Sequence, residues 1–469
     1  MRALATLFLG LSLSGLALAE AEGGAVSQGP ITALDKLQSI KAFRSTPDEA
    51  SRHFNIQSWT TSNGARVLFV RAEELPMLDV HLVFDAGSAR DGGTPGLASM
   101  ASRMMREGTP TRDTTAIAAA FENLGAEFST SSYRDMALAD LRVLTDPQFL
   151  KPAVDVFADV VAHAAYPDIT FKRVYQSAEV GQQQQFQSPS AQASLLFFKN
   201  LYGSHPYATP TTGTPESISR IKPEDLRAFH ERFYVAKNMV IAMVGDLSED
   251  QARAVSEQIS SVLPAGEHAP GLPAVAPLKK ARQVHLAFPS QQTHLILGQP
   301  GITRDDPDYY PLVVGNEILG GAGFGSLLTQ EIREKRGLTY GVSSGFTSMR
   351  AEGPFLISLS TRSDQADEAL ALTREVLKSF LDNGPTDRQV KDTVANLVGS
   401  FPLDTASNDN IVANLGMIGF YNLPLDYLDR YVTSIEAVTP EQIRKAFRRH
   451  VNPDKLLLIT VGQKAPVWK

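Results

Sequence analysis

The stretch of residues 319–346, LGGAGFGSLLTQEIREKRGLTYGVSSGF, combines a glycine-rich turn with two side chains that could bind a peptide. The pattern predicts that the turn opens into an amphipathic helix ending near Gly337 and that residues 338–343 form a strand. Arg333 would then lie in the last helical turn and Tyr340 at the start of the strand. A fork of guanidinium donors and a phenol could therefore face one point on a bound peptide.

The same residues also fit an ordinary protein surface. The charged side chains around Arg333 could form a solvated helix end, with cations near the last carbonyl groups. Tyr340 could be a common strand aromatic. The glycines of residues 320–325 could form a flexible loop that contacts substrate, or a bend that only leads into the helix. The spacing alone leaves these interpretations open.

The composition excludes several classes of chemistry. The chain has 469 residues, of which 43 % are hydrophobic, enough for two to four domains with their own cores. The net charge is −7 and the pI is near 5.8, with no basic patch that would indicate nucleic acid or anionic lipid as a partner. The absence of cysteine excludes disulfides, thiol nucleophiles and thiolate metal sites.

Residues 1–19, MRALATLFLGLSLSGLALA, have the form of a cleavable secretory signal. A membrane anchor is the alternative, but the apolar run is short for a span and ends in an A-x-A site. We therefore expect export, with the periplasm as the compartment and no membrane insertion after cleavage. Residues 20–55 are polar and predict an N-terminal extension.

The chain repeats itself. Residues 221–245, IKPEDLRAFHERFYVAKNMVIAMVG, align without a gap with residues 438–462, VTPEQIRKAFRRHVNPDKLLLITVG. Both segments predict a helix begun by proline, a turn, and a buried strand that ends in glycine. Such a long period indicates a duplicated domain rather than a solenoid.

These patterns predict an α+β protein of two homologous domains, each an antiparallel-rich sheet covered by helices on one face. The first domain would span residues 56–263 and the second residues 283–469, joined by a Pro/Ala/Gly-rich linker at residues 264–282. In the first half, strands are expected at residues 64–70, 77–84 and 135–144, and helices at residues 95–107, capped by Thr94, and at residues 114–124, 147–164 and 169–187.

Three further segments match one family in the right order: GTPGLASMASRMMREGT, LYGSHPYATPTTGTPESI and GGAGFGSLLTQEIREKRGLTYGV. With the duplicated unit, they make the chain from residue 56 onward similar to the pitrilysin/insulinase-type metallopeptidases, in the processing-peptidase-like branch. Active members carry an inverted zinc motif, H-x-x-E-H, on the first helix.

That motif is degenerate in this chain. Ser99 and Arg103 stand where the two histidine ligands would be, and Ser102 stands where the glutamate that activates water would be. A permanent cation at position 103 would repel Zn²⁺. Glu179, 76 residues after Arg103, lies near the expected third ligand. A lone carboxylate does not hold catalytic zinc, so we expect Glu179 on a helix surface and no metal in this chain.

No other residues of the chain restore catalysis. None of the nine histidines forms an H-x-x-E-H or H-x-x-x-H pair, and His205 in a Gly-Ser-His-Pro-Tyr turn is expected to be structural. Ser99 and Ser102 lack a G-x-S-x-G elbow, which argues against a serine hydrolase.

The resemblance gives Arg333 and Tyr340 a role, because the family's Arg/Tyr pair has the spacing R-x₆-Y. Arg333 would donate to backbone carbonyls of the substrate, and Tyr340 would hydrogen-bond the scissile carbonyl. In the branch with half-sized subunits, one subunit keeps the zinc motif and the other keeps this pair. The chain thus resembles the second kind.

The leading hypothesis is a non-catalytic, substrate-binding subunit of a periplasmic zinc endopeptidase heterodimer, with zinc in a homologous partner. Extended peptides would be held by strand addition. The alternative is a catalytically silent structural subunit of a larger complex, and a third hypothesis is a self-sufficient peptidase with a relocated metal site.

Overall fold

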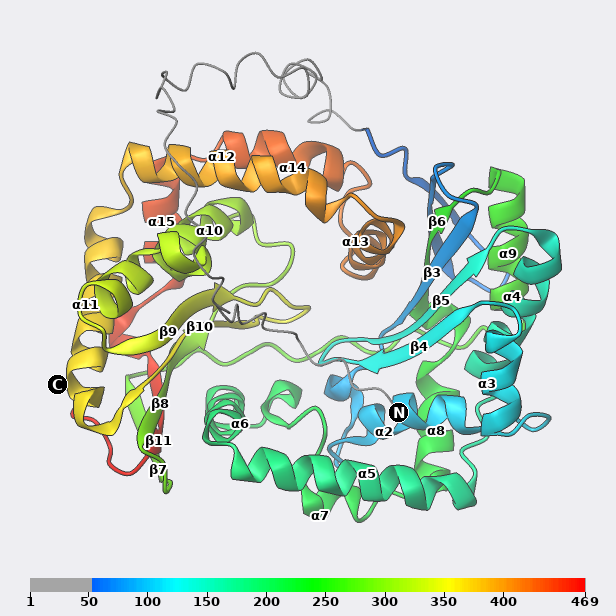
Figure 1. Cartoon of the computed structure of the whole chain (residues 1–469), viewed down its shortest axis with the longest axis horizontal. Helices are drawn as coiled ribbons and strands as arrows, with labels where there is room; N and C mark the ends of the chain where they lie inside the picture. The colour runs from blue at the N-terminus through cyan, green and yellow to red at the C-terminus, as the bar shows by residue number, and fades with distance from the viewer. Residues whose placement is uncertain (1–52, 469) are drawn as a thin grey trace, which may run out of the picture. The chain divides into compact units, whose positions relative to one another are not determined.

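Six strands in the first half of the chain form one sheet (Figure 1). The structure, a computed structural model, describes residues 53–468. The strand order is β1-β2-β6-β3-β5-β4, with β2 and β6 parallel and the other neighbouring strands antiparallel. The strands are β1 (Gln57–Thr60), β2 (Arg66–Arg71), β3 (Met77–Phe84), β4 (Glu127–Ser132), β5 (Ala137–Leu144) and β6 (Met239–Gly245).

The second half repeats this topology without a counterpart of β1. Its five strands follow the order β7-β11-β8-β10-β9, and only β7 and β11 run parallel. The predicted α+β class, with two duplicated and antiparallel-rich domains, is confirmed. The strands are β7 (Arg282–Ala287), β8 (Gln292–Pro300), β9 (Thr339–Phe346), β10 (Pro354–Arg362) and β11 (Leu457–Gly462).

One face of each sheet packs against helices from its own half of the chain. The helical segments of the first half are η3 (Ser88–Arg90), α2 (Leu97–Met104), η4 (Met105–Glu107), α3 (Thr114–Glu122), α4 (Pro147–Ala162), α5 (Asp168–Gln187), α6 (Pro189–Tyr202), η5 (Pro206–Ala208), α7 (Pro215–Ile218), α8 (Pro223–Phe233), η6 (Ala236–Asn238) and α9 (Glu249–Ser261). Those of the second half are α10 (Tyr309–Asn316), η7 (Glu317–Gly321), η8 (Gly323–Gly325), η9 (Thr329–Glu334), η10 (Ser363–Gln365), α11 (Ala366–Asn383), α12 (Asp387–Asp404), α13 (Asn408–Phe420), α14 (Tyr427–Glu436), α15 (Pro440–His450) and η11 (Pro453–Lys455).

The other face of each sheet is covered by a helix from the opposite half. Helix α13 packs on β6 and β3 of the first sheet, and α6 packs on β11 and β8 of the second (Figure 1). Every residue of β6, MVIAMVG, is buried, so this strand needs apolar cover on both faces. At Gly419, next to β6, an added Cβ would lie 2.4 Å from Val240 Cγ1. The sequence-based expectation of helices on one face was therefore incomplete.

One buried carboxylate, that of Asp135, also joins the two halves of the chain. Asp135 is 4 % exposed and accepts hydrogen bonds from Tyr207 Oη, from the main-chain N–H of Arg350 (2.8 Å) and from Tyr421 Oη (3.2 Å). These donors come from η5, from the β9–β10 hairpin and from the end of α13. Burial raises the pKa of the Tyr207 hydroxyl, and the Asp135 carboxylate acts in the same direction. Tyr207 and Tyr421 therefore stay protonated donors.

The segment between the sheets is tied to the first half by side chains that bond its carbonyl groups. Arg90 Nη1 donates to Pro270 O (2.6 Å), and His205 Nε2 donates to Pro273 O (2.9 Å) while its Nδ1 accepts from the Tyr207 N–H (3.1 Å). Burial lowers the pKa of His205, which favours this neutral tautomer. His205 has the structural environment expected from the sequence.

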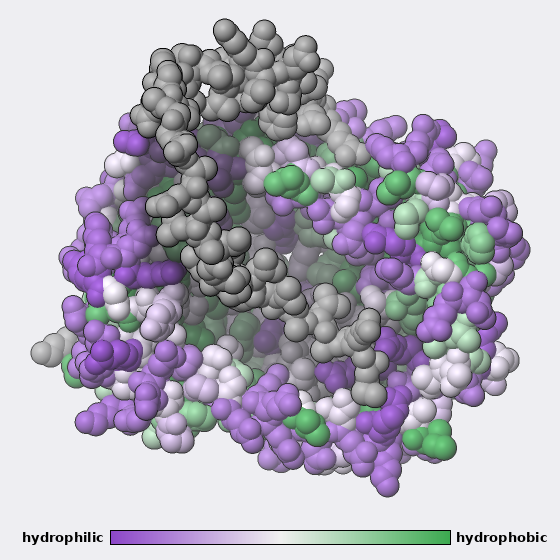
Figure 2. Space-filling model, viewed as in Figure 1, coloured by the Kyte–Doolittle hydropathy of each residue, from purple (hydrophilic) through white to green (hydrophobic). Residues whose placement is uncertain are grey.

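The predicted signal peptide, residues 1–19, lies outside the described residues, as does nearly all of the predicted extension, residues 20–55. Between residues 53 and 468, no helix combines the length and the apolar character that a membrane span requires. On the face shown in Figure 2, hydrophobic side chains lie in small patches separated by hydrophilic ones.

Replacing Asp135 by alanine is expected to lower the free energy of unfolding by about 3 kcal/mol. The change leaves three donors without their buried acceptor, and breaking such a site costs more than any single hydrogen bond contributes. Urea unfolding followed by circular dichroism measures the effect. Asp382→Ala, which removes an exposed partner of Lys378, is the matched control and should change stability by less than about 0.5 kcal/mol. Equal effects of the two substitutions would contradict the role given to Asp135.

Candidate functional site

Helix α2 carries the degenerate zinc segment. The N–H groups at its start are capped by the side chain of Asp91, which precedes the helix. The helix begins after Gly96, whose φ of +94° favours glycine. The two carboxylate oxygens of Asp91 accept from the N–H groups of Gly96 and Ala98, both at 2.7 Å. Asp91, rather than the predicted Thr94, is therefore the acceptor at this helix start. Burial raises the pKa of Asp91 to about 7, although its two N–H bonds act in the opposite direction.

The three motif positions of α2 do not form a zinc site. Ser99 is half-buried, Ser102 is buried with its carbonyl bonded to Thr130 Oγ1 (2.9 Å), and Arg103 is exposed. Hydroxyl groups and a guanidinium are not the ligand set of Zn²⁺ in proteins. Glu179 lies on α5 and is exposed. The residues present at this place therefore do not fit the metal.

A second group of possible metal ligands lies in the other half of the chain. Asp306, Asp308 and His450 have ligand atoms within 4.8 Å of one another. Asp308 Oδ2 already accepts from Arg449 Nη1 (2.6 Å) and faces His450 Nε2 (2.9 Å), and Asp306 Oδ1 accepts from the Asp308 N–H (2.8 Å). Asp308 is thus already paired with the Arg449 cation, and these groups link the residues just before α10 to α15.

Arg333 lies in a π-helical turn, η9, and not in the last turn of a regular helix as the sequence suggested. π-Helical turns are rare and occur frequently at functional sites. The turn closes at Gly337 (φ +62°), whose N–H donates to Arg333 O (2.8 Å). The side chain of Arg333 is half-buried, and its guanidinium carbon lies 4.7 Å from the centroid of the Phe324 ring. No ion pair of this guanidinium is present among residues 53–468.

Tyr340 lies at the start of β9, as predicted, and its side chain is 86 % exposed. Tyr340 and Phe324, which is 68 % exposed, are the two most exposed aromatic residues in the described part of the chain. The structure places Arg333 beside Phe324, and among residues 53–468 no hydrogen bond or cation–π contact joins Arg333 to Tyr340. Within residues 53–468, neither the phenol hydroxyl nor the guanidinium has a hydrogen-bond or ion-pair partner, and the predicted role requires donors that are free in this way.

Tyr340 belongs to β9, an edge strand of the second sheet. β4 ends the first sheet and β9 ends the second. Because the Thr347 N–H bonds Pro354 O, alternate residues of β9, Val342 and Ser344, turn their main-chain groups away from β10. Asn316 Nδ2 already donates to Ser344 O (3.1 Å), so the start of β9 near Val342 is the part that can accept another strand.

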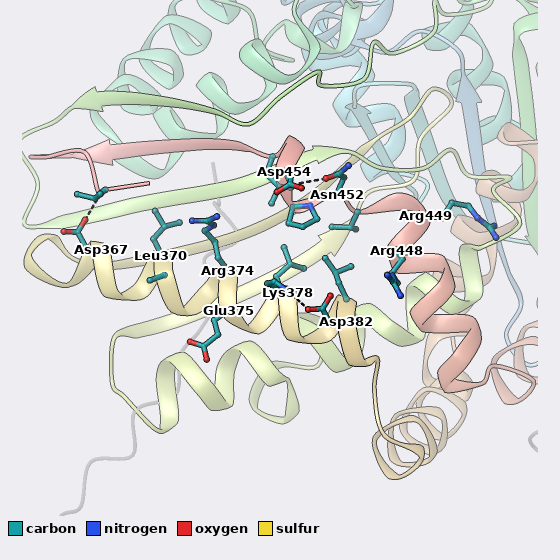
Figure 3. A pocket seen from close by; sticks show the side chains of 17 residues that line it. Asp367, Leu370, Arg374, Glu375, Lys378, Asp382, Arg448, Arg449, Asn452 and Asp454 are labelled. Carbon is teal, nitrogen blue, oxygen red and sulfur yellow. Dashed lines mark hydrogen bonds and ion pairs between the residues drawn. The ribbon is translucent and has the colours of Figure 1, made fainter. Parts of the chain in front are cut away.

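A large groove lies apart from these residues. It has a volume of about 1020 Å³ and lies between α11, the end of α15 and η11 (Figure 3). Charged side chains of both signs line its rim, including Arg374, Lys378, Arg448, Asp382 and Asp454. Helix α11 corresponds to α4 of the first half of the chain. There α9 packs on α4, whereas in the second half the groove lies beside α11. None of the predicted site residues lines this groove.

Sequence reasoning missed Phe324, Asn316 and Asp91. A phenylalanine between two glycines, Gly323 and Gly325, is the sequence feature that could have indicated Phe324. The other two act through contacts that only the fold creates.

Comparison with known proteins gives two family matches. The description "Insulinase (Peptidase family M16)" matches residues 66–214, and "Peptidase M16 inactive domain" matches residues 220–397. A Helicobacter pylori protein named non-peptidase homolog YmxG is 27 % identical over 429 residues, which cover 86 % of this chain and 93 % of that protein. A Bacillus subtilis protein named uncharacterized zinc protease YmxG is 24 % identical over 411 residues, covering 86 % of this chain and 98 % of that protein.

Solved structures agree with these matches. The crystal structure of a peptidase M16 inactive domain from Pseudomonas fluorescens has a TM-score of 0.85 and 45 % sequence identity, covering 88 % of this chain and all of that chain. A chain of complex III from Candida albicans has a TM-score of 0.73 at 15 % identity, covering 87 % of this chain and 96 % of that chain. At that identity the likeness concerns the fold alone.

Replacing Asp91 by asparagine is expected to change how stability depends on pH. The folded pKa of about 7 lies above the unfolded value of about 4, so protonation of Asp91 stabilises the folded chain. That stabilisation is complete below about pH 4 and is lost as the pH rises through about 7, with a slope of at most about 1.4 kcal/mol per pH unit.

The measurement is urea unfolding of the native chain and of Asp91→Asn over this pH range. The native free energy of unfolding should fall relative to that of the variant as the pH rises. Asp382→Asn, at an exposed carboxylate, should leave the native profile unchanged. Parallel profiles of the native chain and Asp91→Asn would contradict the assignment.

Proposed function

The chain belongs to the insulinase (M16) peptidase family, and we propose that it is a substrate-binding subunit that works with a zinc-bearing partner of the same family. The chain is itself an inactive member, because α2 lacks the family's metal ligands. One observation carries the proposal: the zinc positions hold Ser99, Ser102 and Arg103, whereas Arg333 and Tyr340 are present, Arg333 has no ion pair among residues 53–468, and Tyr340 is exposed. The partner would supply the metal and the attacking water.

The two side chains would bind different parts of an extended peptide. Arg333 offers several N–H donors and a charge that no carboxylate of residues 53–468 pairs with, which suits backbone carbonyl groups. Tyr340 offers one hydroxyl donor, which would hydrogen-bond the scissile carbonyl as negative charge develops on its oxygen. One preorganised donor of this kind contributes about 3 kcal/mol to transition-state stabilisation.

The open start of β9 supports this assignment of roles. A peptide that paired with Val342 would lie next to Tyr340, which belongs to the same strand. Arg333 lies in the turn that precedes this strand. Main-chain pairing of this kind depends little on side chains, so the substrates would be short or unfolded and of varied sequence. Export to the periplasm through residues 1–19 completes the proposal.

A structural subunit is the competing function, and the shared fold with a complex III chain is the observation that favours it. Such a subunit would form a stable assembly in which Arg333 and Tyr340 are dispensable. The high exposure of Tyr340 favours the binding role, because an exposed aromatic side chain contributes little to stability.

Mixing the chain with an H-x-x-E-H subunit of the family and labelled casein tests the proposal. Tyr340→Phe should lower kcat/KM by about 100-fold, since it removes one hydroxyl and preserves the ring. Arg333→Ala should lower kcat/KM by about 10- to 100-fold, mainly through KM, because it removes charged hydrogen bonds to the substrate.

The matched controls are Tyr133→Phe and Arg388→Ala, which alter an exposed tyrosine and an exposed arginine elsewhere in the described chain. Both should leave kcat/KM within about twofold of the native value. Full activity of both site variants in a well-formed complex would instead indicate a structural subunit.

A further inference from the structure

Among residues 53–468, the half-buried Arg333 contacts an aromatic ring and forms no ion pair with an anion. The guanidinium carbon of Arg333 lies 4.7 Å from the centroid of Phe324, within the range of a cation–π contact. Two carboxylates lie close to Arg333 in sequence. Glu334 is exposed and forms no ion pair among residues 53–468. Glu331 is bonded to Lys335 and to Arg336 (3.0 Å). These two cations hold the pKa of Glu331 below its usual range. Glu331 is therefore already neutralised.

The choice between a ring and a carboxylate as the partner of Arg333 decides whether its N–H groups can still bind a peptide. A carboxylate would take one or two of the guanidinium N–H groups and cancel its charge. An aromatic face attracts the cation through its quadrupole and leaves the N–H groups in the guanidinium plane free. Arg333 can therefore be oriented by Phe324 and still offer its donors to a peptide.

Phe324 is itself held in place. It lies in η8 between Gly323, with φ of +51°, and Gly325. Ser326 Oγ donates to Gly323 O (2.9 Å), and Gln330 Nε2 donates to Gly325 O (3.1 Å). Gln330 belongs to the same π-helical turn as Arg333. The main chain on either side of Phe324 is thus hydrogen-bonded by side chains, one of which belongs to the turn that carries Arg333.

The exposure of the ring needs a reason beyond folding. Phe324 is 68 % exposed, so most of its apolar surface stays in water and gives little stabilisation. A smaller or polar residue would serve a loop that only leads into a helix. In the described structure, the exposed ring makes a cation–π contact with Arg333.

We propose that Phe324 is a positioning residue that holds the Arg333 guanidinium in its peptide-binding orientation without neutralising it. This inference rests on the proposed function, because it assigns Phe324 a role through Arg333. It also accounts for the glycines on both sides of Phe324, which let a large side chain fold back over the following turn.

A double-mutant cycle on the full chain tests the inference, with the affinity for fluorescein-labelled β-casein as the readout. Phe324→Leu keeps an apolar side chain and removes the π face, so binding should weaken by about two- to fivefold. Phe324→Tyr keeps the ring and should restore native affinity. Phe186→Leu, at another exposed phenylalanine, is the control and should bind as the native chain does.

The Arg333→Ala background separates the possible failures. There, Phe324→Leu should cause no further loss, because Phe324 acts only through the missing cation. An equal loss in both backgrounds would overturn the inference, since Phe324 would then contact the peptide directly. Native affinity of Phe324→Leu, with weak binding by Arg333→Ala, would overturn it while leaving the proposed function intact. Native affinity of Arg333→Ala would refute the proposed role of Arg333 itself. Thermal unfolding midpoints should agree among all variants.

Discussion

The need to cover both faces of each central strand is the constraint on which the rest of the structure depends. β6 and β11 are buried along their whole length, and each half supplies helices for only one face of its own sheet. Exchange of α6 and α13 provides the missing cover and makes the halves inseparable. Asp135 then joins η5, the β9–β10 hairpin and the end of α13 at a single buried point. This arrangement holds Arg333 and Tyr340 in one compact unit with α2.

Helix α2 is held in place by contacts that need no metal ion. Its start is held by Asp91, and its inner face is held by the buried residues Met100 and Met104. None of these contacts involves a zinc ligand. Residues such as Ser99 and Arg103, which lie outside that packing, can differ from the metal-binding types without loss of the helix.

The sequence predicted the elements whose patterns are local. Strand β3 was predicted with its observed bounds because MLDVHLVF reads as strand on its own, and the repeat around residues 221–245 revealed the duplication. β4, EFSTSS, escaped prediction because an edge strand needs few apolar residues. The π-helical turn at Arg333 also escaped, since no residue type specifies it. The cross-packing of α13 depends on pairing between distant segments, which periodicity does not encode.

The central claim is that this chain binds peptide for a metal that it does not carry. Its most direct test is the zinc content of the purified, folded chain after dialysis, together with its hydrolysis of labelled casein in the absence of any companion protein. The account predicts far less than one zinc per chain and no hydrolysis. One tightly bound zinc per chain with persistent hydrolysis would contradict it.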